Sequence, residues 1–171
     1  MKIDDMKGLY MQELRDLYSA ETQLTRSLPT MADGASSPEL RDAITEHWNQ
    51  TKGQVDRLKQ IFTDLGENPD GNFCEATEGL LREGEQVLHD VEKGAVRDAA
   101  IIGAAQRVEH YEVAAYGTCR AFAKLLGFDS HVKLLQETLN EEKMANTSLN
   151  TLAVNLINDR AMAANQTEVR R

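Results

Sequence analysis

The sequence contains few of the residues that interrupt helices or cross-link chains. Only three prolines and two cysteines occur among its 171 residues, and runs in which β-branched residues alternate with polar ones are missing. Ala, Leu, Glu, Gln and Lys dominate instead, a composition that favours helix and predicts an all-α fold. Cys74 and Cys119 lack the CxxC spacing of a zinc or redox motif, and Cys119 falls on a helix face expected to be buried.

The signals of several other protein classes are missing as well. The first residues lack the apolar stretch of a signal peptide, and no apolar run approaches membrane-spanning length. We therefore expect a cytoplasmic protein that does not enter a membrane. Neither a glycine-rich phosphate loop nor a Ser-His-Asp arrangement is present, which argues against a hydrolase. The net charge of −9 would repel a phosphate backbone, so we expect no nucleic-acid partner, whereas metal ions are compatible with it.

Apolar residues three and four positions apart predict five helices. They cover residues 5–28, 38–65, 73–92, 96–126 and 129–158. Asp4 or Asp5 can cap the first helix, and Pro29 should end it. Ser37 followed by a proline marks the start of the second helix, and Gly66 marks its end.

The third, shorter helix lies in a segment long enough to carry the chain from one end of a bundle to the other. The two helices before it and the two after it can therefore form antiparallel hairpins, joined by a long crossover that contains this extra helix. The length of the chain suits one domain, which we place at residues 1–157. Residues 158–171 should form a polar tail that frays.

Each of the four long helices carries polar residues near the middle of an otherwise apolar face. They are Glu21, His47, Gln50, Gln54, Glu109, Glu112, Glu141 and Glu142. Burying several unpaired carboxylates together is costly, and a bound cation is the simplest agent that would make it tolerable. The pattern predicts a metal–carboxylate site inside a helical bundle, and iron or manganese suits mixed carboxylate and imidazole ligands.

Helical spacing indicates which acidic side chains face inward. Glu109 and Glu112 are three residues apart and share a face. Of Glu141 and Glu142 only one can point to the interior, and Glu142 fits the apolar face better, which leaves Glu141 in solvent. His110 should point away from the interior.

Single residues also have structural explanations. Glu21 alone could be an exposed helix residue, and His47 alone could be a core histidine with hydrogen-bond partners. Tyr116 could bond to a carboxylate, although packing is the commoner role of a buried tyrosine. The pair Glu109 and Glu112 is harder to explain in this way.

The stretches LRDLYSAETQL, VRDAAIIGAAQRVEHYEVAAYGT and LLQETLNEEK closely resemble the YciE/YciF family of bacterial stress-response proteins. This resemblance extends over roughly residues 6–155. It implies a ferritin-like four-helix bundle related to rubrerythrins, a homodimer, and a ferroxidase that uses iron or manganese at one or two metal positions with oxygen or peroxide. The metal ligands implied by the resemblance are Glu21, His47, Glu109, Glu112 and Glu142, with Gln50, Gln54 and Tyr116 around them.

Two departures from the family pattern leave a second hypothesis open. Gln50 stands where many relatives have a glutamate, and Ala145 and Asn146 follow Glu142 where other ferritin-like proteins have an ExxH motif. Glutamine is neutral and binds iron poorly, so the metal site could be degenerate or lack a metal altogether. The chain would then be a non-catalytic structural or interaction bundle, with its carboxylates hydrogen-bonded to the glutamines, His47 and tyrosines.

Overall fold

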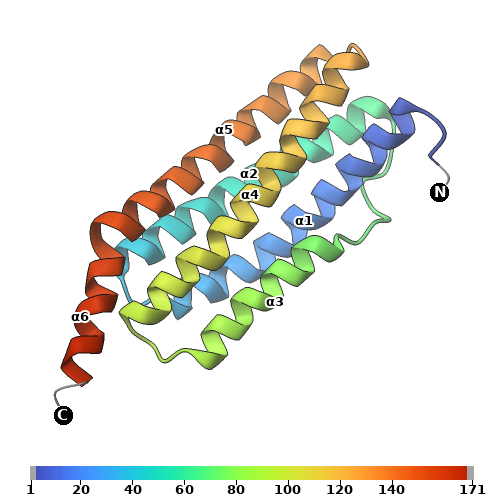
Figure 1. Ribbon diagram of the computed structural model, residues 1–171. Helices are drawn as coiled ribbons and strands as arrows, with labels where there is room; N and C mark the ends of the chain where they lie inside the picture. Colours follow the sequence, from blue (N-terminus) through green and yellow to red (C-terminus); the bar gives the residue numbers. More distant parts are fainter. Residues whose placement is uncertain (1–2, 169–171) are drawn as a thin grey trace.

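Helices account for nearly all of the protein. The computed structural model describes residues 3–168, and every regular element in that range is helical (Figure 1). In chain order the elements are α1 (Met6–Gly34), α2 (Pro38–Leu65), α3 (Glu75–Asp90), α4 (Ala95–Leu125), α5 (Asp129–Leu152), the π-helical turn η1 (Ala153–Ile157) and α6 (Asn158–Glu168). The all-α prediction is confirmed. Across residues 3–168, no helix combines the length and the apolar character needed to cross a lipid bilayer.

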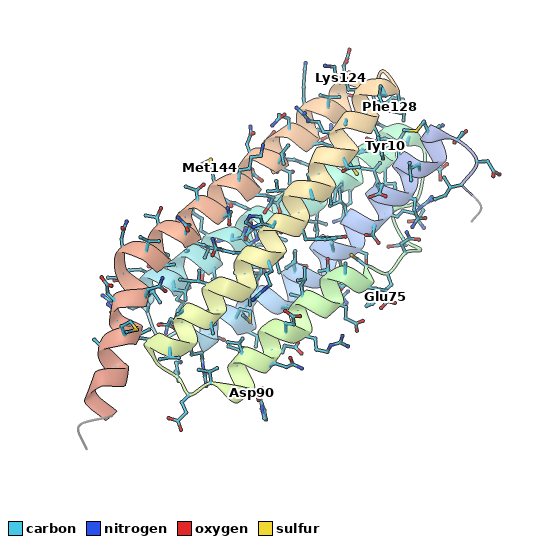
Figure 2. All side chains as sticks on the ribbon, viewed as in Figure 1. Tyr10, Glu75, Asp90, Lys124, Phe128 and Met144 are labelled. Carbon is cyan, nitrogen blue, oxygen red and sulfur yellow. The ribbon has the colours of Figure 1, made fainter. Side chains whose placement is uncertain are left out.

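Four long helices, α1, α2, α4 and α5, lie side by side, and α3 packs against α1 and α4 (Figure 1). Short loops join α1 to α2 and α4 to α5, so each of these pairs is antiparallel. Helix α3 and its flanking loops return the chain along the bundle, and the labels Glu75 and Asp90 in Figure 2 mark the two ends of this helix. Because of this return, α2 and α4 run in the same direction.

Helix α1 continues past Pro29 to Gly34, so the prediction that Pro29 ends it is wrong. A proline has no N–H to donate to the carbonyl four residues earlier, which here belongs to Thr25. Trp48 on α2 supplies the missing donor, because its Nε1–H bonds to the Thr25 carbonyl oxygen at 2.9 Å. A side chain from the neighbouring helix thus satisfies the group that the proline leaves unpaired.

The other predicted caps agree with the structure. Asp5 caps α1 by accepting the N–H of Gly8 at 2.6 Å. Ser37 caps α2 by accepting the N–H of Leu40 at 3.4 Å. Gly66 ends α2 with a φ of 68°, a left-handed conformation that glycine adopts without strain.

The end of the chain differs from the predicted fraying tail over residues 158–171. After α5 the backbone passes through η1 and continues as α6, which packs against α4. Ile157, the last residue of η1, is fully buried in an apolar cluster and anchors the start of α6. Residues 158–168 are therefore helical where fraying was expected, and residues 169–171 lie outside the described part of the chain.

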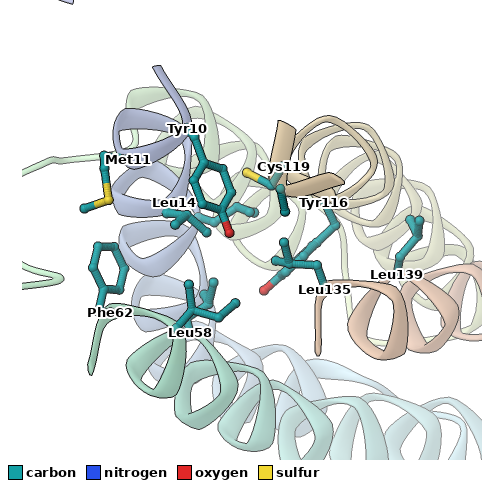
Figure 3. Close-up of a cluster of buried hydrophobic side chains, with 12 residues drawn as sticks. Tyr10, Met11, Leu14, Leu58, Phe62, Tyr116, Cys119, Leu135 and Leu139 are labelled. Carbon is teal, nitrogen blue, oxygen red and sulfur yellow. The ribbon is translucent and has the colours of Figure 1, made fainter. Parts of the chain in front are cut away.

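Two apolar clusters fill the two halves of the bundle. Figure 3 shows the first apolar cluster, in which Tyr10, Leu58, Cys119 and Leu135 come from the four long helices. The second apolar cluster has a similar make-up and contains Leu24, Leu28, Leu40, Ile44, Ile101, Ile102, Leu149 and Ile157. On the long helices the residues of the two clusters are separated by about two to four turns, and polar side chains occupy the space between them.

Candidate metal centre

A layer of buried polar side chains lies between the two apolar clusters. It contains Glu21, His47, Thr51, Gln54, Glu109, Glu112, Thr138 and Glu142, which come from all four long helices. Glu21, Glu112 and Glu142 are 0% exposed, and Glu109 is 2% exposed. The prediction that these four carboxyl side chains face the interior is confirmed. Their role as metal ligands stays a prediction.

Four of these side chains come close enough together to share one ion. His47, Glu109, Glu112 and Glu142 each offer a nitrogen or oxygen atom, and these atoms lie within 4.8 Å of one another. His47 Nε2 is 3.5 Å from Glu109 Oε1. Helix α4 contributes two of the four because residues three positions apart lie on the same helix face. We call these four residues the His–Glu cluster.

Glu21 lies in the same layer but is not one of the four residues of the His–Glu cluster. Its Oε1 accepts a hydrogen bond of 2.5 Å from the hydroxyl of Tyr116, while its Oε2 is buried without a partner. The charges of Glu21 and Glu142 raise the pKa of Glu112, and the charge of Glu142 also raises the pKa of Glu21, whereas a hydrogen bond with Glu112 lowers the pKa of Glu21. Glu21 therefore stands beside the cluster, where it is coupled to it electrostatically.

Burial dominates the electrostatics of this layer. It raises the pKa values of Glu21, Glu109 and Glu112 well above the usual range of a carboxyl, and the neighbouring carboxylates raise them further. Burial likewise raises the pKa of Glu142 to about 7 and lowers that of His47 to about 4. Near neutral pH and without a cation, the cluster thus keeps protons on most of its carboxyls and a neutral imidazole.

The His–Glu cluster leaves many buried polar atoms without hydrogen-bond partners in the described part of the chain. They are both ring nitrogens of His47, Oε2 of Glu109, both carboxyl oxygens of Glu112 and Oε2 of Glu142. Each unsatisfied buried group of this kind costs about 1–3 kcal/mol. A cation bound to these atoms would satisfy several of them at once, and carboxylates with a neutral imidazole are suitable ligands for a divalent transition metal. The cluster can therefore hold a metal ion.

Glu141 is not free in solvent, contrary to the sequence analysis. Its half-buried carboxylate accepts hydrogen bonds of 2.6 and 2.7 Å from Arg57. Gln54 donates to Glu141 at 3.1 Å and also donates to Glu142, which connects the Arg57–Glu141 pair to the His–Glu cluster. Sequence reasoning missed Arg57. The available signal was its position three residues after Gln54, on the same face of α2.

The two positions that depart from the family pattern have different surroundings. Gln50 is half-buried and lines a cavity together with His47 and Glu109. Asn146 accepts a hydrogen bond of 3.1 Å from Gln106, so it is engaged between α4 and α5. Of the two, Gln50 is therefore the one that adjoins the cluster.

Comparison with known proteins gives consistent matches over most of the chain. The family described as a domain of unknown function, DUF892, matches residues 5–162. Protein YciF of Escherichia coli K12 is 41% identical over 162 residues, which cover 94% of this chain and 98% of YciF. A full-length match of this kind extends well beyond the residues of the cluster.

Solved structures agree with this match. The crystal structure of the E. coli stress protein YciF has a TM-score of 0.87 and 42% identity, and covers 91% of this chain and 98% of that one. YcfI from Rhodopseudomonas palustris, described as a candidate structural protein, has a TM-score of 0.86 and 44% identity. It covers 90% of this chain and 98% of that one. A protein from Xanthomonas campestris, at 16% identity and a TM-score of 0.74, shares the fold.

Proposed function

The chain belongs to the DUF892 family and is a relative of YciF, and from this membership we propose that it is a ferritin-like stress-response protein that binds iron or manganese. In its active form it would oxidise Fe(II) with oxygen or peroxide. The observation that carries this proposal is the His–Glu cluster, whose ligand atoms lie together in a buried layer and lack other partners. A homodimer, as the family resemblance implies, is part of the same proposal.

The residues of the chain divide the work at such a site. His47, Glu109, Glu112 and Glu142 would hold the ion, with Glu21 as an additional ligand. Iron, when bound, supplies the electrons that reduce oxygen or peroxide. Tyr116 orients Glu21 through its hydroxyl. Because the carboxyls hold protons when no metal is bound, metal binding would release these protons, and metal affinity should increase with pH.

Metal content and Fe(II) oxidation test the proposal directly. Elemental analysis after purification and after anaerobic Fe(II) addition should find at least one ion per chain, and exposure to oxygen or peroxide should then oxidise it. Glu112→Gln removes a buried carboxylate from the cluster and should lower Fe(II) affinity by at least about tenfold. Glu83→Gln, which removes the same charge from an exposed position on α3, is the control and should leave binding unchanged. Failure of the wild-type protein to bind or oxidise iron would defeat the enzyme proposal.

Gln50 offers a gain-of-function test. Its side chain lines the same cavity as His47 and Glu109, so Gln50→Glu adds a carboxylate to the cavity that reaches the cluster. We expect tighter Fe(II) or Mn(II) binding, measured by competition with a coloured chelator. Asn49→Asp adds the same charge on the exposed side of α2 and should change affinity little. Equal affinities in the two variants would count against a ligand position at residue 50.

A non-catalytic structural bundle is the competing function. Two observations favour it: YcfI, at 44% identity, is described as a candidate structural protein, and Gln54 already donates a hydrogen bond to Glu142. In this case the carboxyls would stay protonated and metal would not raise the melting temperature. A rise in melting temperature with Fe(II) or Mn(II) in the wild type, lost in Glu112→Gln, would exclude this alternative.

A further inference from the structure

A cavity of about 230 Å³ leads from the surface to the His–Glu cluster. It lies in the half of the bundle that contains the second apolar cluster and is lined by residues of α1 to α5. Exposed side chains line it at two places: Arg26 and Glu85 beside α1 and α3, and Glu46 and Met144 beside α2 and α5. Figure 2 shows Met144 on the outer side of α5. The cavity is therefore open to molecules from solvent.

The wall of the cavity is mainly hydrocarbon. The apolar side chains that line it include Leu24, Leu28, Ile44, Leu80, Ile101, Ala104, Ala105, Val108, Ala145 and Leu149. Alanines from two helices leave room where larger side chains would fill the bundle. An apolar cavity of about 150 Å³ already holds a benzene molecule and stays free of water. A cavity of this size and lining is suited to an apolar ligand.

The inner end of the cavity is polar. His47 and Glu109 line it, both are more than nine-tenths buried, and neither ring nitrogen of His47 has a hydrogen-bond partner among the described residues. Oε2 of Glu109 is unpartnered in the same way. If each residue gives one atom to a metal ion, each still has a second nitrogen or oxygen. These atoms are themselves covered, so the polar end of a ligand reaches them when the side chain of His47 or Glu109 turns toward the cavity.

The charges around the cavity restrict which chemical group the ligand can place at the inner end. Among the described residues that line it, the only cationic side chain is Arg26, which is exposed, while the inner end carries Glu109. A carboxylate or phosphate group at the inner end would be desolvated without a cation to pair with it. A hydroxyl group can both donate and accept a hydrogen bond, and it carries no charge.

We propose that this cavity binds an alkyl chain that ends in a hydroxyl-type group, such as a medium-chain alcohol, with its polar end at His47 and Glu109 and its chain along the apolar wall. The proposal goes beyond metal binding and does not depend on it. It is therefore tested on the metal-free protein, where failure of the iron proposal would leave the result unaffected.

A series of primary alcohols from 1-butanol to 1-dodecanol tests the proposal by heteronuclear NMR of the metal-free protein. Affinity should rise about fourfold with each added methylene while the chain still fills the cavity, and should then stop rising. Octanoate, which has a similar chain and a charged end, should bind at least about tenfold more weakly than 1-octanol at neutral pH. No saturable binding, an affinity that still rises at 1-dodecanol, or equal binding of octanoate would overturn the proposal.

Two substitutions locate the site. Ala104→Phe on α4 and Ala145→Phe on α5 place a ring in the cavity from different helices and should each weaken 1-octanol binding at least about tenfold. Ala114→Phe adds the same ring at an exposed position of α4 and should leave affinity within about twofold. Unchanged binding in a folded cavity variant would overturn the assignment. If neither variant folds by circular dichroism, the chain-length limit measured on the wild type decides.

Discussion

Replacing Glu142 by glutamine keeps the shape of the side chain and removes its ionisable group. The side chain is 0% exposed, and burial raises the pKa of its carboxyl from 4.5 to about 7. A glutamine at this position can still accept the hydrogen bond that Gln54 donates to Glu142. The variant therefore removes one ionisable carboxyl from the metal-free cluster, together with the charge that raises the pKa values of Glu21, Glu109 and Glu112.

The sign of the effect follows from the raised pKa. The folded protein binds the Glu142 proton more tightly than the unfolded chain does. The contribution of this proton to the free energy of unfolding is therefore fully present below about pH 4.5, and it is lost as the pH rises through about 7. A pKa difference of about 2.5 between the folded and unfolded states corresponds to about 3 kcal/mol of unfolding free energy lost at alkaline pH. His47, whose pKa burial lowers to about 4, acts in the opposite direction between about pH 4 and pH 6.5. This contribution of His47 is shared by wild type and variant, and it cancels in their difference.

Urea unfolding of both metal-free proteins at about pH 5 and about pH 8 measures that difference. From about pH 5 to about pH 8, we expect the free energy of unfolding of Glu142→Gln to rise by about 2–3 kcal/mol relative to that of the wild type. The same variant should lose most of the stabilisation that Fe(II) or Mn(II) gives to the wild type. Glu83→Gln on the surface of α3 should show neither effect. A pH-independent difference between Glu142→Gln and wild type would refute the view that the cluster is a strained, protonated group of carboxyls.

Two further substitutions test individual hydrogen bonds. Trp48→Phe removes the donor to the Thr25 carbonyl and should lower the free energy of unfolding. In a Pro29→Ala background, where a backbone N–H is restored, this loss should be about 1 kcal/mol smaller. Equal losses in a double-mutant cycle of urea unfolding would contradict our account of α1. Tyr116→Phe removes the hydroxyl that lowers the pKa of Glu21, so ¹³C NMR should show that pKa rising further, and an unchanged titration would refute this contact.

Local signals determined most helix ends, and they failed where a distant contact overrides them. Ser37 and Gly66 bound α2 because a cap and a left-handed glycine act within a few residues. Pro29 does not end α1, because Trp48 on another helix donates a hydrogen bond to the Thr25 carbonyl that the proline leaves unpaired. The polarity of the chain after residue 158 suggested fraying, whereas burial of Ile157 against the bundle continues the helix.

Spacing also predicted that the four glutamates of the polar layer are buried, because a helix face is a property of the local sequence, but it missed the buried Asp98. It placed Glu21, Glu109, Glu112 and Glu142 inside correctly. It could not reveal that Arg57 holds Glu141 at the edge of the layer, because that pair joins two helices. It also could not reveal the cavity, since an unfilled volume depends on how side chains from five helices fit together.

The energetics of the polar layer favour a bound cation over a purely structural role. Replacing a buried ionic group by a well-packed apolar one is often neutral or stabilising, so a bundle selected for stability alone has no need of such a layer. Here the layer interrupts the apolar core, the nitrogens of His47 lack hydrogen-bond partners among the described residues, and the oxygens of Glu112 lack a donor when the neighbouring carboxyls are ionised. Hydrogen bonds from Gln54 and Tyr116 satisfy only one oxygen each of Glu142 and Glu21. A cation that contacts the remaining atoms would supply the stabilisation that the packing of this layer lacks, which is why metal-dependent stability is the decisive measurement.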